Sequence, residues 1–425
     1  MIRSSRSFQQ RILGLIDIGT SKVACLIVAV EPRGPSILPG MDMPFRVLGA
    51  GHQRARGIKA GVITDLDEAE VSVRAAVDQA ERMAGVTLDE VYVAVACGRL
   101  RSENFASTGA IDSGVVSDED IARVLDGGRS YAEREGRMLV HMNRIGVRLD
   151  GAPGGNDPRG MAAAELSIDL HAVTADDAPV RNLLLLVERC YLGVAGLVVS
   201  PFASALAATT AEERRLGVTV IDIGAGVTTI AQFSDGHLIH ADTVPVGGNL
   251  MTFDVARALQ TPLVEAERIK ALYGTVVRAP SDEHEAFGYP LAGEGEGEMH
   301  QTTKAILAEI LRPRAHGLIS LAMERIEHSG VSQWSGDRVV LTGGGSQLVG
   351  LAEFTANMIG RPVRASGPDQ AAGLPTGLAM PTFSTVVGLV SAAAAGHGLV
   401  TAHGEKSLLT QGYLVRVGQW LKRGF

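Results

Sequence analysis

The sequence predicts an α/β protein with two similar domains around a ligand cleft, because one glycine-containing hairpin pattern occurs twice. The first copy, residues 15–24, is LIDIGTSKVA, and the second, residues 220–229, is VIDIGAGVTT. Each copy is an apolar strand ending in Asp, followed by a turn of Gly and small residues and by a second apolar run. Two such hairpins facing each other would form a phosphate clamp, since Gly lets backbone N–H groups approach an anion closely. The duplication therefore predicts a nucleotide between two similar domains.

A third glycine turn supports the clamp, since a single Asp-Ile-Gly could be an ordinary turn in which Asp and Gly serve local needs. Residues 338–351, RVVLTGGGSQLVGL, are predicted to form a strand that breaks into three glycines at the start of a helix. At such a turn the backbone can pack directly against a base or ribose. The residues expected at this contact are Gly343, Gly344, Gly345 and Ser346.

In their order, these three turns resemble the phosphate 1, phosphate 2 and adenosine motifs of the actin, Hsp70 and sugar-kinase superfamily. The surroundings of the second turn narrow the resemblance to bacterial FtsA, the actin-like division protein. The resemblance to FtsA extends from about Arg11 to Phe425. Its most specific part is the string after the second turn, and the match is weaker from Val91 to Gly160. The strings that carry it are 212–218 (EERRLGV), 245–249 (PVGGN), 265–270 (EAERIK) and 307–314 (LAEILRPR), together with a short amphipathic C-terminus.

The resemblance implies an α/β, actin-like duplicated fold, with two RNase H-like domains around a nucleotide cleft. It also implies an inserted αβ subdomain, SHS2-like and termed 1C, and a C-terminal amphipathic helix. The expected divisions are 11–88 for the first part of subdomain 1A, 89–166 for the insert 1C, 167–215 for the second part of 1A and the connecting helix, 216–244 for the first part of subdomain 2A, 245–328 for subdomain 2B, 329–391 for the second part of 2A and the return to 1A, 392–412 for a flexible linker and 413–425 for the amphipathic helix.

Local patterns predict several elements within these divisions. Residues 67–84 have the apolar spacing of an amphipathic helix, and Ser117 is a good N-cap with acidic residues after it. Residues 279–300 are rich in Gly, Glu and Pro and are predicted to be a mobile loop. Residues 382–400 contain no Asp, Glu, Lys or Arg. Their Ser, Gly and Ala content favours a buried helix over the alternative of a membrane span.

Composition agrees with a soluble, multidomain protein. With 425 residues the chain exceeds the size of a single growing core. Its formal net charge of −8 argues against a nucleic-acid partner, which would normally require a basic surface. The three cysteines are far apart and form no C-x-x-C pair, which indicates free thiols in a reducing compartment. Because the first residues do not form a signal peptide, we expect the protein to stay in the cytoplasm.

The two hairpins supply the candidate site residues for ATP and Mg²⁺. Asp17 and Asp222 are the expected Mg²⁺ ligands, acting through water because Mg²⁺ dehydrates reluctantly. Lys22 is a point charge suited to the β-phosphate. Backbone and hydroxyl donors to the phosphates are expected from Gly19, Thr20 and Ser21 on one side and from Gly224, Ala225, Gly226 and Thr228 on the other.

Two further groups have alternative explanations. Glu267 and Lys270 match family positions that approach the nucleoside, but they could equally form an exposed i,i+3 ion pair. Gly247 and Gly248 precede a helix N-terminus, which favours an anion, although helix capping alone explains them as well.

The site lacks an evident general base, and no catalytic residue is assigned. Many superfamily ATPases place an acid or Gln just before the connecting-helix Pro, and an Asp or His three residues after the last phosphate 2 glycine. This chain has Ser200 and Thr229 at these positions. Because an unperturbed hydroxyl is a very weak base, we expect at most a weak ATPase.

The last thirteen residues, 413–425, predict a second function. Wound as a helix, they place a basic polar face with Arg416 and Gln419 opposite an apolar face. This pattern is typical of a helix lying in the interface of a membrane with anionic lipids, although such a helix could also dock on its own domain. The residues expected to bind the membrane are Leu414, Val417, Trp420, Leu421, Lys422, Arg423 and Phe425.

The FtsA resemblance implies an ATP-binding protein that polymerises and anchors filaments of the tubulin-like protein FtsZ to the membrane. It places the protein at the cytoplasmic face of the inner membrane, at the division septum. The implied partners are the FtsZ C-terminal peptide at subdomain 2B, further copies of the chain, later division proteins at subdomain 1C and anionic lipids, with no nucleic acid. The alternatives are an actin-like ATPase or sugar kinase of the same superfamily, and a pilus-assembly actin homologue.

Overall fold

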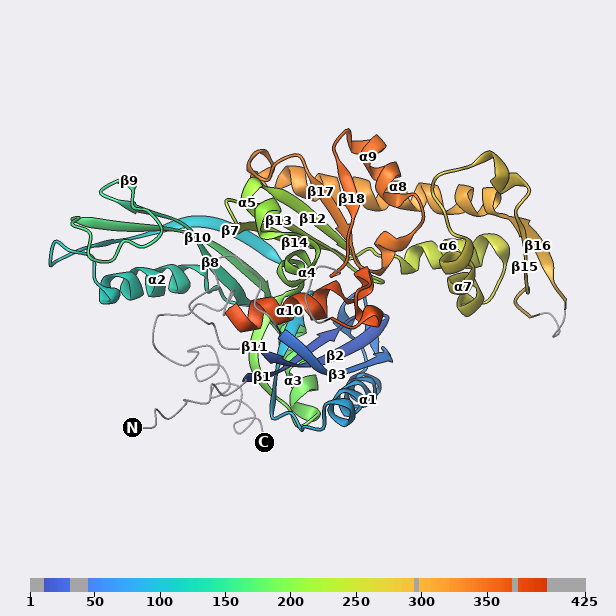
Figure 1. Cartoon of the computed structure of the whole chain (residues 1–425), viewed down its shortest axis with the longest axis horizontal. Coiled ribbons are helices and arrows are strands. Elements are labelled where there is room, and N and C mark those ends of the chain that lie inside the picture. The colour runs from blue at the N-terminus through green and yellow to red at the C-terminus, as the bar shows by residue number, and fades with distance from the viewer. Residues whose placement is uncertain (1–10, 31–44, 294–297, 369–373, 396–425) are drawn as a thin grey trace, which may run out of the picture.

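Two five-stranded sheets with the same topology form the centre of the molecule (Figure 1). The computed structural model describes residues 11–30, 45–293, 298–368 and 374–395. In each sheet an antiparallel meander of three strands is followed by two strands that are added in parallel. The equivalence of strand order and direction confirms the duplication that the two hairpins predict.

The first sheet has the order β11-β6-β1-β2-β3, and the second has the order β14-β13-β12-β17-β18. The strands of the first sheet are β1 (Arg11–Ile18), β2 (Lys22–Val30), β3 (Phe45–Arg54), β6 (Glu90–Val95) and β11 (Gly193–Val199). Those of the second are β12 (Val218–Ile223), β13 (Thr228–Ser234), β14 (His237–Val244), β17 (Val339–Thr342) and β18 (Val363–Ala365).

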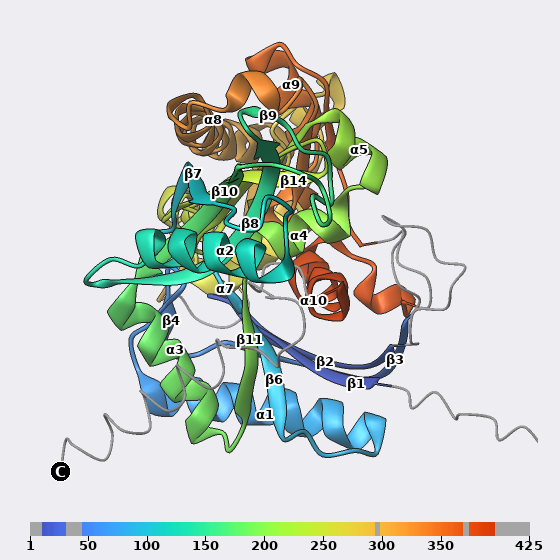
Figure 2. The same ribbon diagram turned by 90° about the vertical axis from the view of Figure 1, so that its left-hand side faces the viewer.

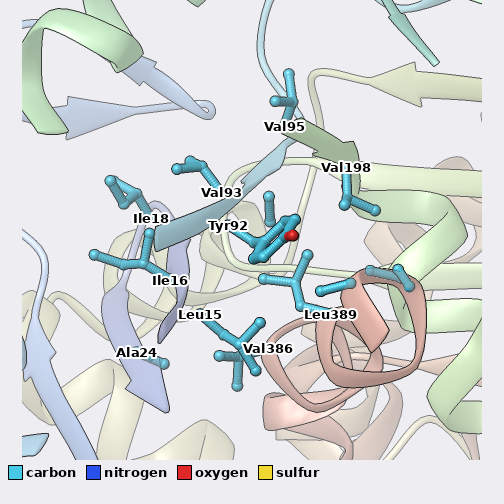
Figure 3. Packing of buried hydrophobic residues seen from close by; sticks show 14 of the residues in the cluster. Leu15, Ile16, Ile18, Ala24, Tyr92, Val93, Val95, Val198, Val386 and Leu389 are labelled. Carbon is cyan, nitrogen blue, oxygen red and sulfur yellow. The ribbon is translucent and has the colours of Figure 1, made fainter. Parts of the chain in front are cut away.

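Helices cover both faces of the first sheet, as the turned view in Figure 2 shows. One face carries α1 (Leu66–Ala84) and α3 (Asp177–Arg189), and the other carries α10 (Ser384–Ala395). Asp65 caps α1 by accepting from the backbone N–H groups of Asp67 and Glu68, and the helix confirms the one predicted over 67–84. Figure 3 shows the core beneath α10, where Val386 and Leu389 meet Leu15 and Tyr92. Short elements nearby are β4 (Ile58–Lys59) and β5 (Val62–Ile63).

Two helices lie between the sheets and connect the domains. Helix α4 (Ser200–Ala208) packs on strands of the second sheet, α10 packs on strands of the first, and the two helices pack on each other. The predicted linker therefore starts too early, because Ala392 and Ala393 are buried in the core on the last turn of α10. Residues 396–412 of that linker and the predicted helix 413–425 lie outside the described residues. No helix in the described part of the chain is long and apolar enough to cross a membrane.

An inserted αβ subdomain follows β6. Its sheet has the order β7-β10-β8-β9, and α2 (Asp118–Ala132) covers one face, starting with the predicted Ser117 cap in a capping box with Asp120. The predicted boundaries of 89–166 are wrong at both ends. Strand β6 belongs to the first sheet, and β10 continues to Asp176. The strands are β7 (Arg101–Ala110), β8 (Arg137–Leu149), β9 (Ala152–Pro153) and β10 (Glu165–Asp176).

The insert is joined by the chain to the first domain but also docks on the edge of the second sheet. Ser102 exchanges two hydrogen bonds with the backbone of Ala241, of 2.8 and 2.7 Å. Asn104 and Asn143 each donate to a backbone carbonyl of β14 at 3.0 Å. These side chains satisfy backbone groups of a strand that would otherwise be an open sheet edge.

The second domain carries its own accessory subdomain, at the right in Figure 1. The predicted mobile loop at 279–300 contains ordered elements, because β15 pairs with β16 in an antiparallel hairpin. Stacking of Tyr273 on Phe287, with ring centroids 4.3 Å apart, packs this hairpin onto a helix. The elements are α6 (Asn249–Leu259), α7 (Leu263–Tyr273), η1 (Pro280–Glu283), β15 (Ala286–Tyr289), β16 (His300–Thr303) and α8 (Lys304–His328).

The remaining short elements connect these units. They are α5 (Ala211–Leu216), η2 (Ser332–Trp334), η3 (Gly344–Gln347), α9 (Leu351–Ile359), η4 (Thr376–Leu378) and η5 (Pro381–Phe383).

Candidate functional site

A cavity of about 800 Å³ lies between the two domains and is lined by all three glycine turns. Its walls come from the hairpin turns of both sheets, from α6 and α7 of the accessory subdomain and from the turn before η3. The structure brings together fifteen of the predicted site residues, which are Asp17, Gly19, Thr20, Ser21, Lys22, Asp222, Gly224, Ala225, Gly226, Gly248, Glu267, Lys270, Gly343, Gly344 and Gly345.

The two hairpin turns have the same backbone hydrogen bond and touch each other. The Gly19 N–H donates to the Lys22 carbonyl at 2.9 Å, and the Gly224 N–H donates to the Val227 carbonyl at 3.0 Å. A Cβ atom on Gly226 would lie 2.6 Å from Oγ1 of Thr20, so a larger residue fits here only if Thr20 or the turn shifts. The shared turn geometry explains why the two sequence motifs are alike, and the contact brings both turns to one cavity.

The carboxyl groups of Asp17 and Asp222, one at each hairpin, both have raised pKa values. Burial raises the pKa of Asp17 to about 6, with a smaller contribution from Asp222, while the charge of Lys22 opposes the shift. Burial also raises the pKa of Asp222, and hydroxyls of Ser204 and Thr385 oppose it. Thr385 donates to a carboxylate oxygen of Asp222 at 3.2 Å. The cavity therefore contains carboxylates that are poorly solvated and suited to a cationic ligand.

Lys22 is held by the segment that leads into α10. Its Nζ donates to the backbone carbonyl of Thr382 and, at 2.9 Å, to the hydroxyl of the same residue. The ammonium also lies 4.7 Å from the ring centroid of Phe383. Burial lowers the pKa of Lys22, and the charges of Asp17 and Asp222 oppose this. No feature of the local sequence indicated Thr382, because it comes 360 residues after Lys22.

Two predicted site residues do not line the cavity. The hydroxyl of Thr228 donates to the carbonyl of Val246 at 2.8 Å, and the residue is fully buried. The hydroxyl of Ser346 donates to the carbonyl of Gly343 at 2.8 Å. Both therefore stabilise loops behind the cavity, and the prediction that they face a ligand is wrong in this geometry.

Thr229 and Ser200 line the cavity instead, although no binding role was predicted for either residue. Thr229 is 5% exposed, and its Oγ1 finds no hydrogen-bond partner in the part of the chain that the structure describes. A clue was available in the sequence. Successive residues of a strand point to opposite faces, so Thr228 and Thr229 could not both face the ligand.

Glu267 and Lys270 form the predicted ion pair, but the Lys270 side chain is only 15% exposed. The two side chains form an i,i+3 ion pair at 2.7 Å, and both line the cavity. Lys270 also donates to Thr252 at 2.7 Å and to the Gly248 carbonyl at 3.2 Å, so it fixes the start of α6 beside the cavity. The Gly248 N–H donates to the Gly224 carbonyl at 2.9 Å. This bond favours capping over anion binding at that N–H.

Comparisons with known proteins agree on one family. A sequence model described as "Cell division protein FtsA" matches residues 219–388, and one described as "SHS2 domain inserted in FTSA" matches residues 97–174. The chain is 40% identical to the cell division protein FtsA of Rhizobium meliloti, over 99% of this chain and 96% of that protein. It is 31% identical to FtsA of Neisseria meningitidis, over 98% and 99%. The SHS2 match begins after the end of β6 at Val95 and ends before the end of β10 at Asp176.

Solved structures confirm the fold. The PilM–PilN type IV pilus biogenesis complex aligns with a TM-score of 0.61 at 16% identity, covering 90% of this chain and 98% of that chain. MreB5 of Spiroplasma citri bound to ADP aligns with a TM-score of 0.50 at 12% identity, covering 91% and 97%. At these identities the likeness shows the actin-like fold alone. The identities to the division proteins over nearly the full chain show that it belongs to the FtsA family of bacterial cell division proteins.

Proposed function

We propose that the cavity binds ATP with Mg²⁺ and that the bound nucleotide holds the two domains together. The observation that carries this proposal is the convergence of both duplicated turns and the third glycine turn on one cavity of about 800 Å³. That volume is in the range of ordinary ligand pockets. The ADP-bound structure of the MreB5 neighbour supports the class of ligand.

The residues at the cavity fit this ligand. Asp17 and Asp222 would hold the hydrated metal, and Lys22 would exchange its contact with Thr382 for a phosphate oxygen. When bound, Mg²⁺ supplies positive charge against the phosphates. Ser200 and Thr229 offer hydroxyls but no carboxylate or imidazole, so we propose that hydrolysis is slow and that the nucleotide biases assembly.

We further propose that the protein forms filaments and anchors FtsZ filaments to the cytoplasmic face of the inner membrane at the septum. Family membership supports this role. The accessory subdomain from α6 to α8 is the proposed contact for the FtsZ C-terminal peptide. The insert from β7 to β10 is proposed to contact neighbouring copies and later division proteins. Residues 413–425 are the proposed membrane anchor, through an amphipathic helix with a basic face.

Sedimentation with anionic liposomes, with and without ATP, tests the membrane part of the proposal. Burying each large apolar side chain contributes about 1.5–3 kcal/mol, whereas each basic residue contributes roughly 1 kcal/mol. Trp420→Glu should therefore abolish binding, and Lys422→Ala should only weaken it, more visibly at low salt. ATP binding should persist in both variants. If Trp420→Glu still sediments with vesicles, the helix does not anchor the protein to lipid.

A further inference from the structure

Thr229 is a buried hydroxyl without a partner in the described part of the chain, and it lines the cavity between the domains. The adjacent Thr228 is also buried, but its hydroxyl bonds to the Val246 carbonyl. A buried hydroxyl left without a partner is costly, and native structures rarely keep one unless a ligand or water satisfies it. The contrast between two neighbouring threonines indicates that Thr229 serves something inside the cavity.

The position of Thr229 identifies the part of the ligand. On the antiparallel β12–β13 pair, Thr229 is directly opposite Asp222, so their side chains lie on the same face of the sheet. Ser200, at the start of α4, also lines the cavity and is 5% exposed. Asp222, Thr229 and Ser200 are all buried residues of the lining. Glu267, which also lines the cavity, has a side chain that is 54% exposed.

The sequence motifs predict the nucleoside near Lys270 and the triple-glycine turn, and the phosphates at the hairpin turns, where Thr229 faces the same side as Asp222. Resting on the proposed function, we propose that the Thr229 hydroxyl donates a hydrogen bond to an oxygen of the terminal phosphate. Thr229 thereby distinguishes a nucleoside triphosphate from a diphosphate. Ser200 is a second buried hydroxyl of the same lining.

This assignment suits a site that recognises the triphosphate without consuming it quickly. A threonine hydroxyl donates well to an anionic oxygen, and hydrogen bonds to charged groups are the stronger ones. It is a poor acceptor of a proton from water at neutral pH. Thr229 would therefore bind the terminal phosphate without acting as a general base for its hydrolysis.

Calorimetric titration with a non-hydrolysable ATP analogue and with ADP, both with Mg²⁺, tests the proposal on the full chain. Thr229→Val should weaken binding of the ATP analogue about tenfold and leave the affinity for ADP unchanged. Thr229→Ser keeps the hydroxyl and should retain the preference. Thr228→Val is the matched control, since it removes a hydroxyl one residue away that is already bonded to Val246. It should lower stability and leave the ratio of the two affinities unchanged.

Folding of the key variant can be checked independently. Because Thr229→Val removes an unpartnered hydroxyl and keeps the shape of the side chain, its melting temperature without nucleotide should be no lower than that of the wild type. A triphosphate preference equal to the wild type in Thr229→Val would overturn the inference. So would an equal loss for both nucleotides.

Repeating the titrations without Mg²⁺ tests whether Thr229 bonds to water on the metal instead of to the phosphate. If the effect of Thr229→Val disappears without Mg²⁺, the hydroxyl serves water bound to the metal and the inference is wrong. Failure of the wild type to bind either nucleotide would instead defeat the proposed function itself. The two failures are therefore distinguishable.

Discussion

The two hairpins have the same fold and the same carboxylate at the same place, yet Asp17 and Asp222 differ in what holds them. Asp222 is 7% exposed and accepts a hydrogen bond from Thr385 on α10, and the hydroxyl of Ser204 on α4 lowers its pKa. For Asp17, the only influence that opposes its raised pKa is the charge of Lys22. The second-domain carboxylate thus has hydroxyl partners on both interdomain helices, whereas the raised pKa of the first-domain carboxylate is opposed by the charge of Lys22.

This difference indicates that the duplicated motif has diverged in role. The helices α4 and α10 pack on each other between the sheets, so a change in their arrangement would reach Asp222 directly. Asp17 lies on the first sheet, where its partner Lys22 is shared with the turn before α10. Asp222 is the carboxylate whose position depends on how the domains sit together.

The largest effect is expected from removing the oriented carboxylate or the lysine. Asp222→Ala or Lys22→Ala should weaken ATP binding in the presence of Mg²⁺ by about 2–3 kcal/mol, or roughly 30-fold to 150-fold. Far-UV circular dichroism should stay near wild type, because these groups serve the ligand more than the core. Unchanged affinity in both variants would mean that the clamp has been placed at the wrong residues.

Asp17 should instead dominate the pH dependence of stability. Because its pKa is raised to about 6, the folded state binds its proton more tightly than the unfolded chain between roughly pH 4 and 6. The free energy of unfolding therefore falls as pH rises through this window. Asp17→Asn should reduce the fall, and the remainder comes from Asp222, whose pKa is also raised. The variant should stabilise the ligand-free protein by only about 1–2 kcal/mol at pH 7, since Asp17 is partly exposed at the cavity.

Urea unfolding at a series of pH values from 4 to 7 measures this effect. Glu267→Gln is the control, because it changes an exposed carboxylate of the same cavity. The same slope in Asp17→Asn and in the wild type would show that Asp17 is not the titrating group.

A smaller effect is expected from the hydroxyl that orients Asp222. Thr385→Val removes a donor to its carboxylate and should raise the pKa of Asp222 further. Affinity for ATP with Mg²⁺ should fall about threefold to fivefold at neutral pH, and more at pH 5.5. Comparing titrations at pH 5.5 and 8 checks this. A loss that is the same at both pH values would point to a direct contact of Thr385 with the ligand.

The sequence predicted what depends on local structure. The three turns were recognisable because Asp, Gly and a preceding apolar strand act within a few residues. The Ser117 cap at the start of α2 was predicted for the same reason. The boundaries of the insert were not, because β6 is assigned to the first sheet only by its pairing with β1 and β11, which are far away in sequence.

The errors at the site also have physical causes. Thr228 and Thr229 differ by one position, and one residue along a strand reverses the face of a side chain. The hairpin of β15 and β16 was missed because composition indicated a loop, whereas stacking on Tyr273 supplies the missing stabilisation. No sequence motif predicted that Thr382 and Thr385 contact the site, because the chain returns to the cavity only through the packing of α10.

The central claim is that one nucleotide is held between the two hairpins, and the contact between Gly226 and Thr20 offers the most direct test. A side chain at Gly226 would force the turns apart, because its Cβ would lie 2.6 Å from Oγ1 of Thr20. Calorimetric titration with ATP and Mg²⁺ should give one site per chain in the wild type and no measurable binding in Gly226→Val. Wild-type affinity in that variant, or two independent sites in the wild type, would contradict the account.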